Sequence, residues 1–124
     1  MKIFYKVAPA EVEVMEVLWE QEKMILTRDL LELMAARGRN WKRQTLNTVI
    51  SRLDSKGLVI RKRGYVIAAL TEEELMRKLA RRILDEYYDG KLKNFCIALL
   101  GKSAETEAKI DKLVSEVEKL EKES

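Results

Sequence analysis

The sequence has no histidine, and it has a single cysteine and a single proline among its 124 residues. Without histidine, and with Cys96 alone, the chain lacks the usual ligands of zinc sites and the usual general base at neutral pH. One cysteine also excludes an internal disulfide. We therefore predict no bound metal, no cofactor and no enzymatic activity.

Long hydrophobic runs are also missing. No apolar stretch approaches the roughly 18 to 20 residues that span a bilayer, and the N-terminal segment turns acidic too soon for a secretory signal peptide. We expect a cytoplasmic protein with no membrane partner. Hydrophobic residues nevertheless make up 47% of the chain, and its length suits one compact domain or a small domain with a helical appendage.

Positive charge is unevenly distributed along the chain. Residues 37–63, here called the basic block, contain nine basic residues and one acidic residue. By contrast, residues 1–36 hold four basic and seven acidic residues, and residues 64–124 hold 11 and 13. A basic block between two acidic segments predicts a surface that faces a polyanion. A solvated lysine-rich face is the simpler explanation, and the order of the secondary-structure elements argues against it.

The hydrophobic pattern predicts three helices before the end of the basic block. The first begins at Pro9, which suits a first helical position, and has an apolar stripe with Val12 beside it. The second follows Thr27, a good N-cap, and ends near Gly38. The third covers residues 41–57, where apolar residues recur at spacings of three and four.

Residues 58–70 are rich in β-branched side chains and carry Gly64 directly after a basic triplet. This pattern predicts a β-hairpin with a charged tip. Three helices followed by a basic hairpin is the order of a winged helix-turn-helix, in which the third helix lies in the major groove of DNA and the wing touches the backbone. The predicted fold class is therefore mainly α with a small β-hairpin, with a winged-helix domain in residues 1–70 and a helical dimerisation region in residues 71–124.

The exposed face of the third helix presents long or amide-bearing donors, the side chains that reach base edges and phosphates. The DNA-contacting residues predicted from this face and from the wing are Lys42, Arg43, Gln44, Thr45, Asn47, Arg61, Lys62 and Arg63. Solubilising charge on an edge strand is the alternative explanation of the wing triplet.

The tail begins with Thr71 and Glu74, which have the form of a capping box. Apolar residues follow at helical spacing. Residues 95–100 are apolar throughout, and we expect them to be covered by a partner surface. We predict a homodimer on a near-palindromic, double-stranded DNA operator. The predicted dimerisation residues are Leu79, Ile83, Tyr87, Phe95, Leu99, Leu100, Leu113, Val117 and Leu120.

Three stretches carry a family resemblance: AEVEVMEVLWE in the first helix, WKRQTLNTVISRLDSKGLV in the third, and TEEE at the start of the tail. They resemble the penicillinase-repressor family of bacterial regulators, the BlaI/MecI type. The resemblance implies a winged-helix transcriptional repressor that dimerises through its C-terminal helices. It also implies DNA contacts by Thr45, Thr48 and Arg52, which match the family's two threonines and its arginine. Gln44 and Asn47 stand where members often have basic residues, so no operator sequence carries over.

A different class of function uses the same basic block. In that alternative, the chain is a winged-helix protein-interaction module that binds an acidic partner protein. The two functions differ in salt dependence, since neutralising several phosphates makes binding fall steeply with salt. An enzyme ranks third.

Overall fold

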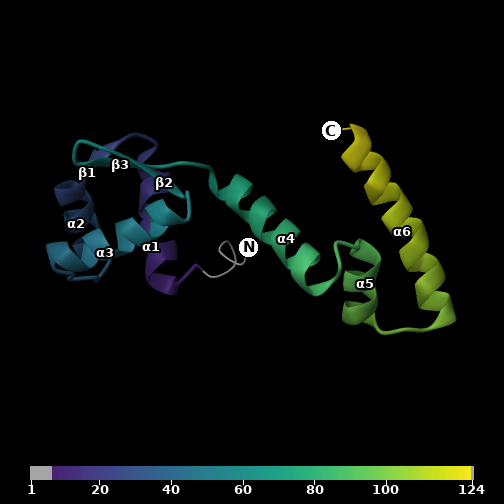
Figure 1. Cartoon of the computed structure of the whole chain (residues 1–124). Coiled ribbons are helices and arrows are strands. Elements are labelled where there is room, and N and C mark those ends of the chain that lie inside the picture. The colour runs from purple at the N-terminus through teal and green to yellow at the C-terminus, as the bar shows by residue number, and fades with distance from the viewer. Residues whose placement is uncertain (1–6, 124) are drawn as a thin grey trace. The chain divides into compact units, whose positions relative to one another are not determined.

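The computed structural model describes residues 7–123, which fall into two compact units that divide between Lys78 and Leu79 (Figure 1). The elements of the described residues are α1 (Pro9–Gln21), β1 (Ile25–Leu26), α2 (Thr27–Ala36), α3 (Arg43–Ser55), β2 (Val59–Lys62), β3 (Tyr65–Ala68), α4 (Glu72–Tyr87), α5 (Leu92–Leu100) and α6 (Ala104–Glu123). The predicted fold class is confirmed, because helices dominate and the strands form one small antiparallel sheet.

The core of the first unit lies between α1, α2 and α3. Leu30 and Met34 of α2 and Leu46 and Leu53 of α3 are fully buried. The apolar residues of α3 are buried, as their spacing predicts, and the polar face of that helix therefore lies outward. At the end of this unit, the indole Nε1 of Trp19 donates a hydrogen bond to the carbonyl of Leu70 at 2.9 Å, which ties the segment before α4 to α1.

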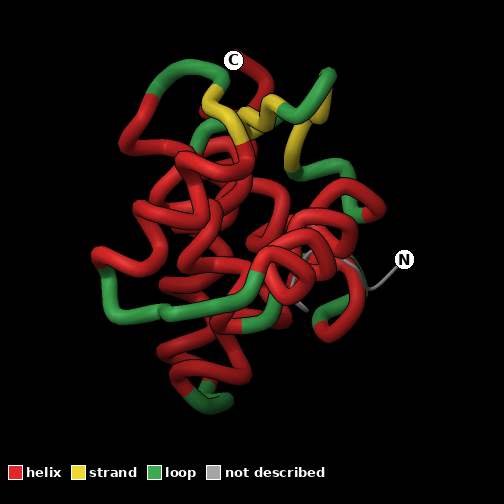
Figure 2. The backbone as a smooth tube through the Cα atoms, turned by 90° about the vertical axis from the view of Figure 1, so that its left-hand side faces the viewer, coloured by secondary structure: helices red, strands yellow, loops and turns green. Residues whose placement is uncertain are grey.

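The predicted hairpin is formed by β2 and β3, with Lys62 opposite Tyr65. Its two-residue turn consists of Arg63 and Gly64, whose φ angles are 53° and 81°. Positive φ at both central residues is the signature of a type I′ turn, which matches the twist of the strands. The sheet has a third strand that the sequence did not predict, β1, which pairs with β3 (Figure 2, strands in yellow).

The N-cap prediction for Thr27 is wrong. Thr27 is the first residue of α2, and Leu26 occupies the cap position without a side-chain hydrogen bond. Instead, the backbone N–H and the side-chain hydroxyl of Thr27 both donate to the carbonyl of Gly64, at 2.9 and 3.0 Å. The threonine therefore anchors the hairpin turn to the start of α2, a long-range role that local capping rules do not reveal.

Two details of the helices also differ from the predictions. The third helix begins at Arg43 with Lys42 as its N-cap, two residues later than expected, and it ends at Ser55. Val12, expected beside the apolar stripe of α1, is 40% exposed, whereas Glu11 is buried. Glu11 accepts hydrogen bonds from the ammonium group of Lys56, which explains how a carboxylate is accommodated there.

The predicted capping box is present at the start of α4. The backbone N–H of Thr71 donates to the Glu74 carboxylate at 3.0 Å, and the backbone N–H of Glu74 donates to the Thr71 hydroxyl at 3.1 Å. The hydrogen bond from the backbone N–H of Thr71 to the Glu74 carboxylate, with a smaller contribution from the Thr71 side chain, holds the pKa of Glu74 below its ordinary value.

In the second unit, α5 packs against α6, with Cys96 and Ile110 buried between them. The rings of Tyr88 and Phe95 meet edge to face with centroids 5.2 Å apart. Lys93 of α5 forms ion pairs with Asp111 at 2.9 Å and Glu107 at 3.4 Å on α6, and the hydrogen bond to Asp111 raises its pKa. Among residues 7–123, no helix is long and apolar enough to cross a membrane.

Candidate nucleic-acid interface

One side of α3 forms an open groove that is lined only by polar side chains. The lining residues are Gln44, Asn47, Thr48, Ser51, Arg52 and Ser55. They recur at intervals of three and four, so they share a face, and they lie opposite the buried apolar stripe of the same helix. All six are exposed, as are the other predicted contacts on this helix, Thr45 and Arg43, and its N-cap Lys42.

Several hydroxyl groups in this groove are already engaged within the protein. The Thr48 hydroxyl donates to the carbonyl of Gln44 at 3.0 Å, and the Ser55 hydroxyl donates to the carbonyl of Arg52 at 2.9 Å. Ser51 accepts a hydrogen bond from the Arg61 guanidinium at 3.3 Å. The side-chain amides of Gln44 and Asn47 make no hydrogen bond among the described residues, so both the donor and the acceptor of each amide remain available to a ligand.

The basic block divides into two groups of residues. Four of its nine cations form ion pairs, and these are Arg37 with Glu16, Arg39 with Glu13, Lys56 with Glu11 and Arg61 with Asp54. Within residues 7–123 the other five form no ion pair, and these are Lys42, Arg43, Arg52, Lys62 and Arg63. Much of the charge asymmetry seen in the sequence therefore reflects pairing between an acidic first helix and basic residues that follow it.

The basic residues of the wing lie in two places. Arg61 reaches back to α3, where it contacts Ser51 and, at 4.0 Å, Asp54. Both partners of this ion pair are about half exposed, so the pair adds little to stability and leaves the guanidinium accessible. Lys62 and Arg63, by contrast, lie at the end of the hairpin, which Thr27 ties to the start of α2.

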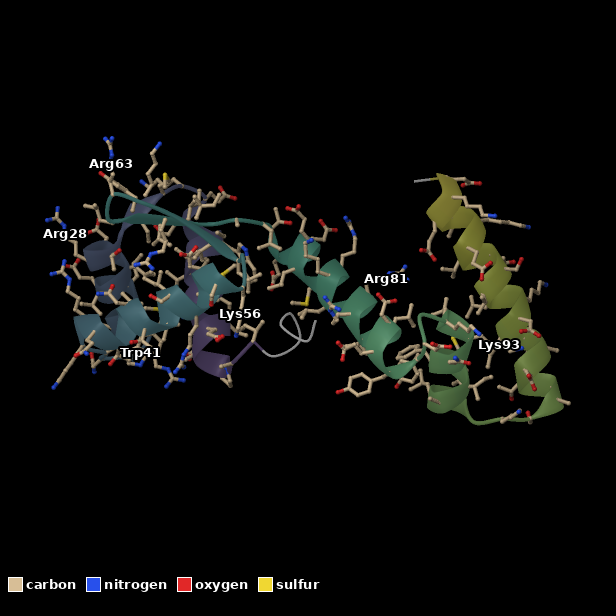
Figure 3. The ribbon with its side chains drawn as sticks, in the orientation of Figure 1. Arg28, Trp41, Lys56, Arg63, Arg81 and Lys93 are labelled. Atoms are coloured by element: carbon tan, nitrogen blue, oxygen red, sulfur yellow. The ribbon has the colours of Figure 1, made fainter. Side chains whose placement is uncertain are left out.

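Arg28, which follows Thr27 in α2, is a candidate DNA contact that the sequence did not predict. Because Thr27 bonds to Gly64, Arg28 lies near the hairpin turn, and Figure 3 shows both Arg28 and Arg63 at the edge of the unit. Arg28 is exposed and forms no ion pair among the described residues. It belongs to the acidic first segment of the sequence, so only the pairing of Thr27 with Gly64 could have identified it.

Comparison with known protein sequences identifies the family of this chain. Residues 7–119 match the sequence profile of the family described as penicillinase repressor. The chain belongs to the penicillinase repressor family. Its relatives include the methicillin resistance regulatory protein MecI of Mammaliicoccus sciuri, 25% identical, and MecI of Staphylococcus aureus, 24% identical. Each alignment covers 88% of this chain and 90% of the relative. The penicillinase repressor family is a regulatory one, so the prediction that the chain is not an enzyme is confirmed.

The predicted dimerisation residues lie in the tail of the chain. Seven of the nine predicted dimerisation residues are at least 37% exposed in the single chain, namely Ile83, Tyr87, Phe95, Leu99, Leu100, Leu113 and Leu120. Leu79 and Val117 are half-buried. The exposed residues leave the second unit with a large apolar surface, and their role in dimerisation stays a prediction.

Proposed function

We propose that this member of the penicillinase repressor family acts as a homodimer on a near-palindromic operator, with α3 in the major groove and the wing on the phosphate backbone. The proposal rests on one observation, which is that some cations of the basic block form ion pairs with acidic residues of the described chain and others do not. The five that have no acidic partner in the described chain lie on α3, at its N-cap or at the end of the hairpin. Cations left without an internal counter-ion are the ones available to phosphate.

The start of α3 supports the same orientation. Its cap residue, Lys42, has no side-chain hydrogen bond, and no acidic residue occupies the first turn. Helix N-termini carry unpaired N–H groups and a partial positive charge, which favour anions. An N-terminal turn with Lys42 and Arg43 beside it is therefore suited to lie against a phosphate, with the groove behind it facing the bases.

The apolar surface of the second unit supports a dimer. Leu99 and Leu100 on α5 and Leu113 and Leu120 on α6 are each about half exposed or more. Monomeric proteins rarely leave such a surface uncovered. A second copy of the chain would cover it and place two reading helices on one duplex, as a near-palindromic site requires.

The test is a titration of the purified protein against the DNA upstream of its own gene, followed by footprinting. We expect a protected near-palindrome and an affinity that falls steeply with salt, because several phosphates are neutralised. Weak, salt-insensitive binding without protection would reject the proposal and would favour an acidic protein partner instead.

Two variants make this test sharper. Lys62→Ala removes a cation that has no ion-pair partner in the described chain, whereas Arg37→Ala removes one already paired with Glu16. Each lost phosphate contact reduces the slope of log K against log salt by about 0.9, so a dimer that loses two should show a change of about 1.8. We expect this change for Lys62→Ala and little change for Arg37→Ala. Equal slopes for the two variants would contradict the assignment.

A further inference from the structure

The two amides in the α3 groove differ from its other polar groups. The hydroxyl protons of Thr48 and Ser55 are used in hydrogen bonds to backbone carbonyls of the same helix. The amides of Gln44 and Asn47 are exposed and make no hydrogen bond within residues 7–123. Each amide therefore offers one donor group and one acceptor to an incoming molecule.

This donor and acceptor pair matches one base in particular. In the major groove, adenine presents its N7 acceptor beside its N6 donor, and a side-chain amide pairs with both at once. Guanine presents two acceptors there, which suit a guanidinium better than an amide. Of the groups in the groove, only Arg52 carries a guanidinium, and it lies eight residues from Gln44, toward the far end of α3.

The spacing of the amides matches the spacing of base pairs. Gln44 and Asn47 are three residues apart in an α-helix, which separates them by about 4.5 Å along its axis. Successive bases of one strand are about 3.4 Å apart along the duplex. Side chains at this helical spacing also lie on one face. The two amides are therefore placed to meet neighbouring base pairs.

We propose that Gln44 and Asn47 read adenine at two adjacent A·T pairs in each half-site. This inference rests on the proposed function and adds to it the class of sequence that is bound.

The experiment first selects sites for the unaltered protein from a pool of random duplexes. Each adenine at the two strongest adjacent positions is then replaced by 7-deazaadenine, which lacks the N7 acceptor and still pairs with thymine. We expect each replacement to weaken binding by about 5- to 100-fold, the discrimination that one bidentate amide contact provides. This measurement uses the unaltered chain, so it does not depend on how a variant folds.

Variants then assign each position to one side chain. Asn47→Ala should lose its preference for adenine at one position and become insensitive to 7-deazaadenine there, and Gln44→Ala should do so at the neighbouring position. Asn40→Ala is the matched control, because Asn40 is an exposed amide outside the groove. Its selected sequence should be unchanged.

The outcomes separate this inference from the proposed function. Selected sites without adenine at adjacent positions, or adenine preferences that persist in both variants, would overturn the inference and leave the repressor proposal standing. Absence of any sequence-selective duplex binding would overturn both.

Discussion

The two units of the chain differ in where they keep their apolar side chains. Among the described residues, the first unit buries fifteen of them, drawn from its three helices, its sheet, the loop residue Leu58 and the start of α4. In the second unit only Cys96 and Ile110 are buried among the described residues, while leucines of α5 and α6 are up to 70% exposed. The first unit therefore completes its own core, whereas the second leaves most of its large apolar side chains partly or fully exposed.

The largest effect is expected in the core of the first unit. Leu53 of α3 is fully buried, so Leu53→Ala should lower the free energy of unfolding by about 2 to 5 kcal/mol, through lost burial and the cavity that remains. Urea denaturation measures this. Leu99→Ala, the same substitution at a leucine that is 70% exposed, should cost less than about 0.5 kcal/mol in dilute, monomeric protein. Equal costs at the two positions would remove the contrast between the units.

The next effect concerns self-association. Leu99→Glu places a charge in the proposed dimer surface, and we expect the dimer to weaken by about 100-fold or more, since burying an unpaired charge is costly. Sedimentation equilibrium at micromolar concentration reports the change. Lys102→Glu introduces the same charge at an exposed position outside the apolar faces of α5 and α6 and should remain dimeric. A Leu99→Glu protein that is still fully dimeric would show that α5 does not form the interface.

A smaller effect is expected at the hairpin turn. Arg63 has a φ of 53°, a left-handed conformation that is unfavourable for most side chains, and Asn-Gly is a preferred pair for this turn. Arg63→Asn should therefore raise the free energy of unfolding by about 0.5 to 1 kcal/mol while it weakens binding to all DNA sequences alike. Thermal unfolding and a salt titration measure the two effects. If stability rose and DNA binding were unchanged, the arginine would have no phosphate contact to explain its presence.

The smallest effect is a pH dependence at the start of α4. Because the folded chain lowers the pKa of Glu74, the stabilisation from its capping contact is present above the ordinary pKa of a glutamate and is lost as the pH falls through the lowered value. Below about pH 4 the unaltered protein should lose slightly more stability than Glu74→Gln, which keeps a capping side chain without a charge. Thermal midpoints at pH 7 and pH 3 measure the difference, and parallel curves would contradict it.

The sequence predicted the features that depend on local pattern. The buried stripe of α3, the hairpin around Gly64 and the capping box at Thr71 follow from spacing and turn chemistry within a few residues. The features it missed depend on pairs far apart in the chain. The strand at Ile25 is too short to show a period, and its partner, Val66, lies 41 residues later. The neutralisation of Arg39 by Glu13 likewise requires α1 to lie beside the loop before α3.

For the candidate site, the sequence predicted contacts on the helix and the wing from their positions alone, with Lys62 included and Lys56 left out. The physical reason to separate these two lysines is the ion pair of Lys56 with the buried Glu11, which the sequence does not reveal. Burial of an acidic residue at position 11 has no signal in composition, because the same helix carries three further glutamates that are partly or fully exposed. Only packing decides which charges remain for a ligand.

The bonds from Thr27 to Gly64 have a consequence for the kinetics of binding. They fix the hairpin tip to the helix-turn-helix before any ligand arrives, at 2.9 and 3.0 Å. The entropy of ordering this loop is therefore lost during folding and does not oppose association. In the proposed complex, α3 and the wing would meet a duplex as one preorganised body. We therefore expect diffusion and charge to govern the encounter rate, and changes at the hairpin tip that break these bonds to slow association.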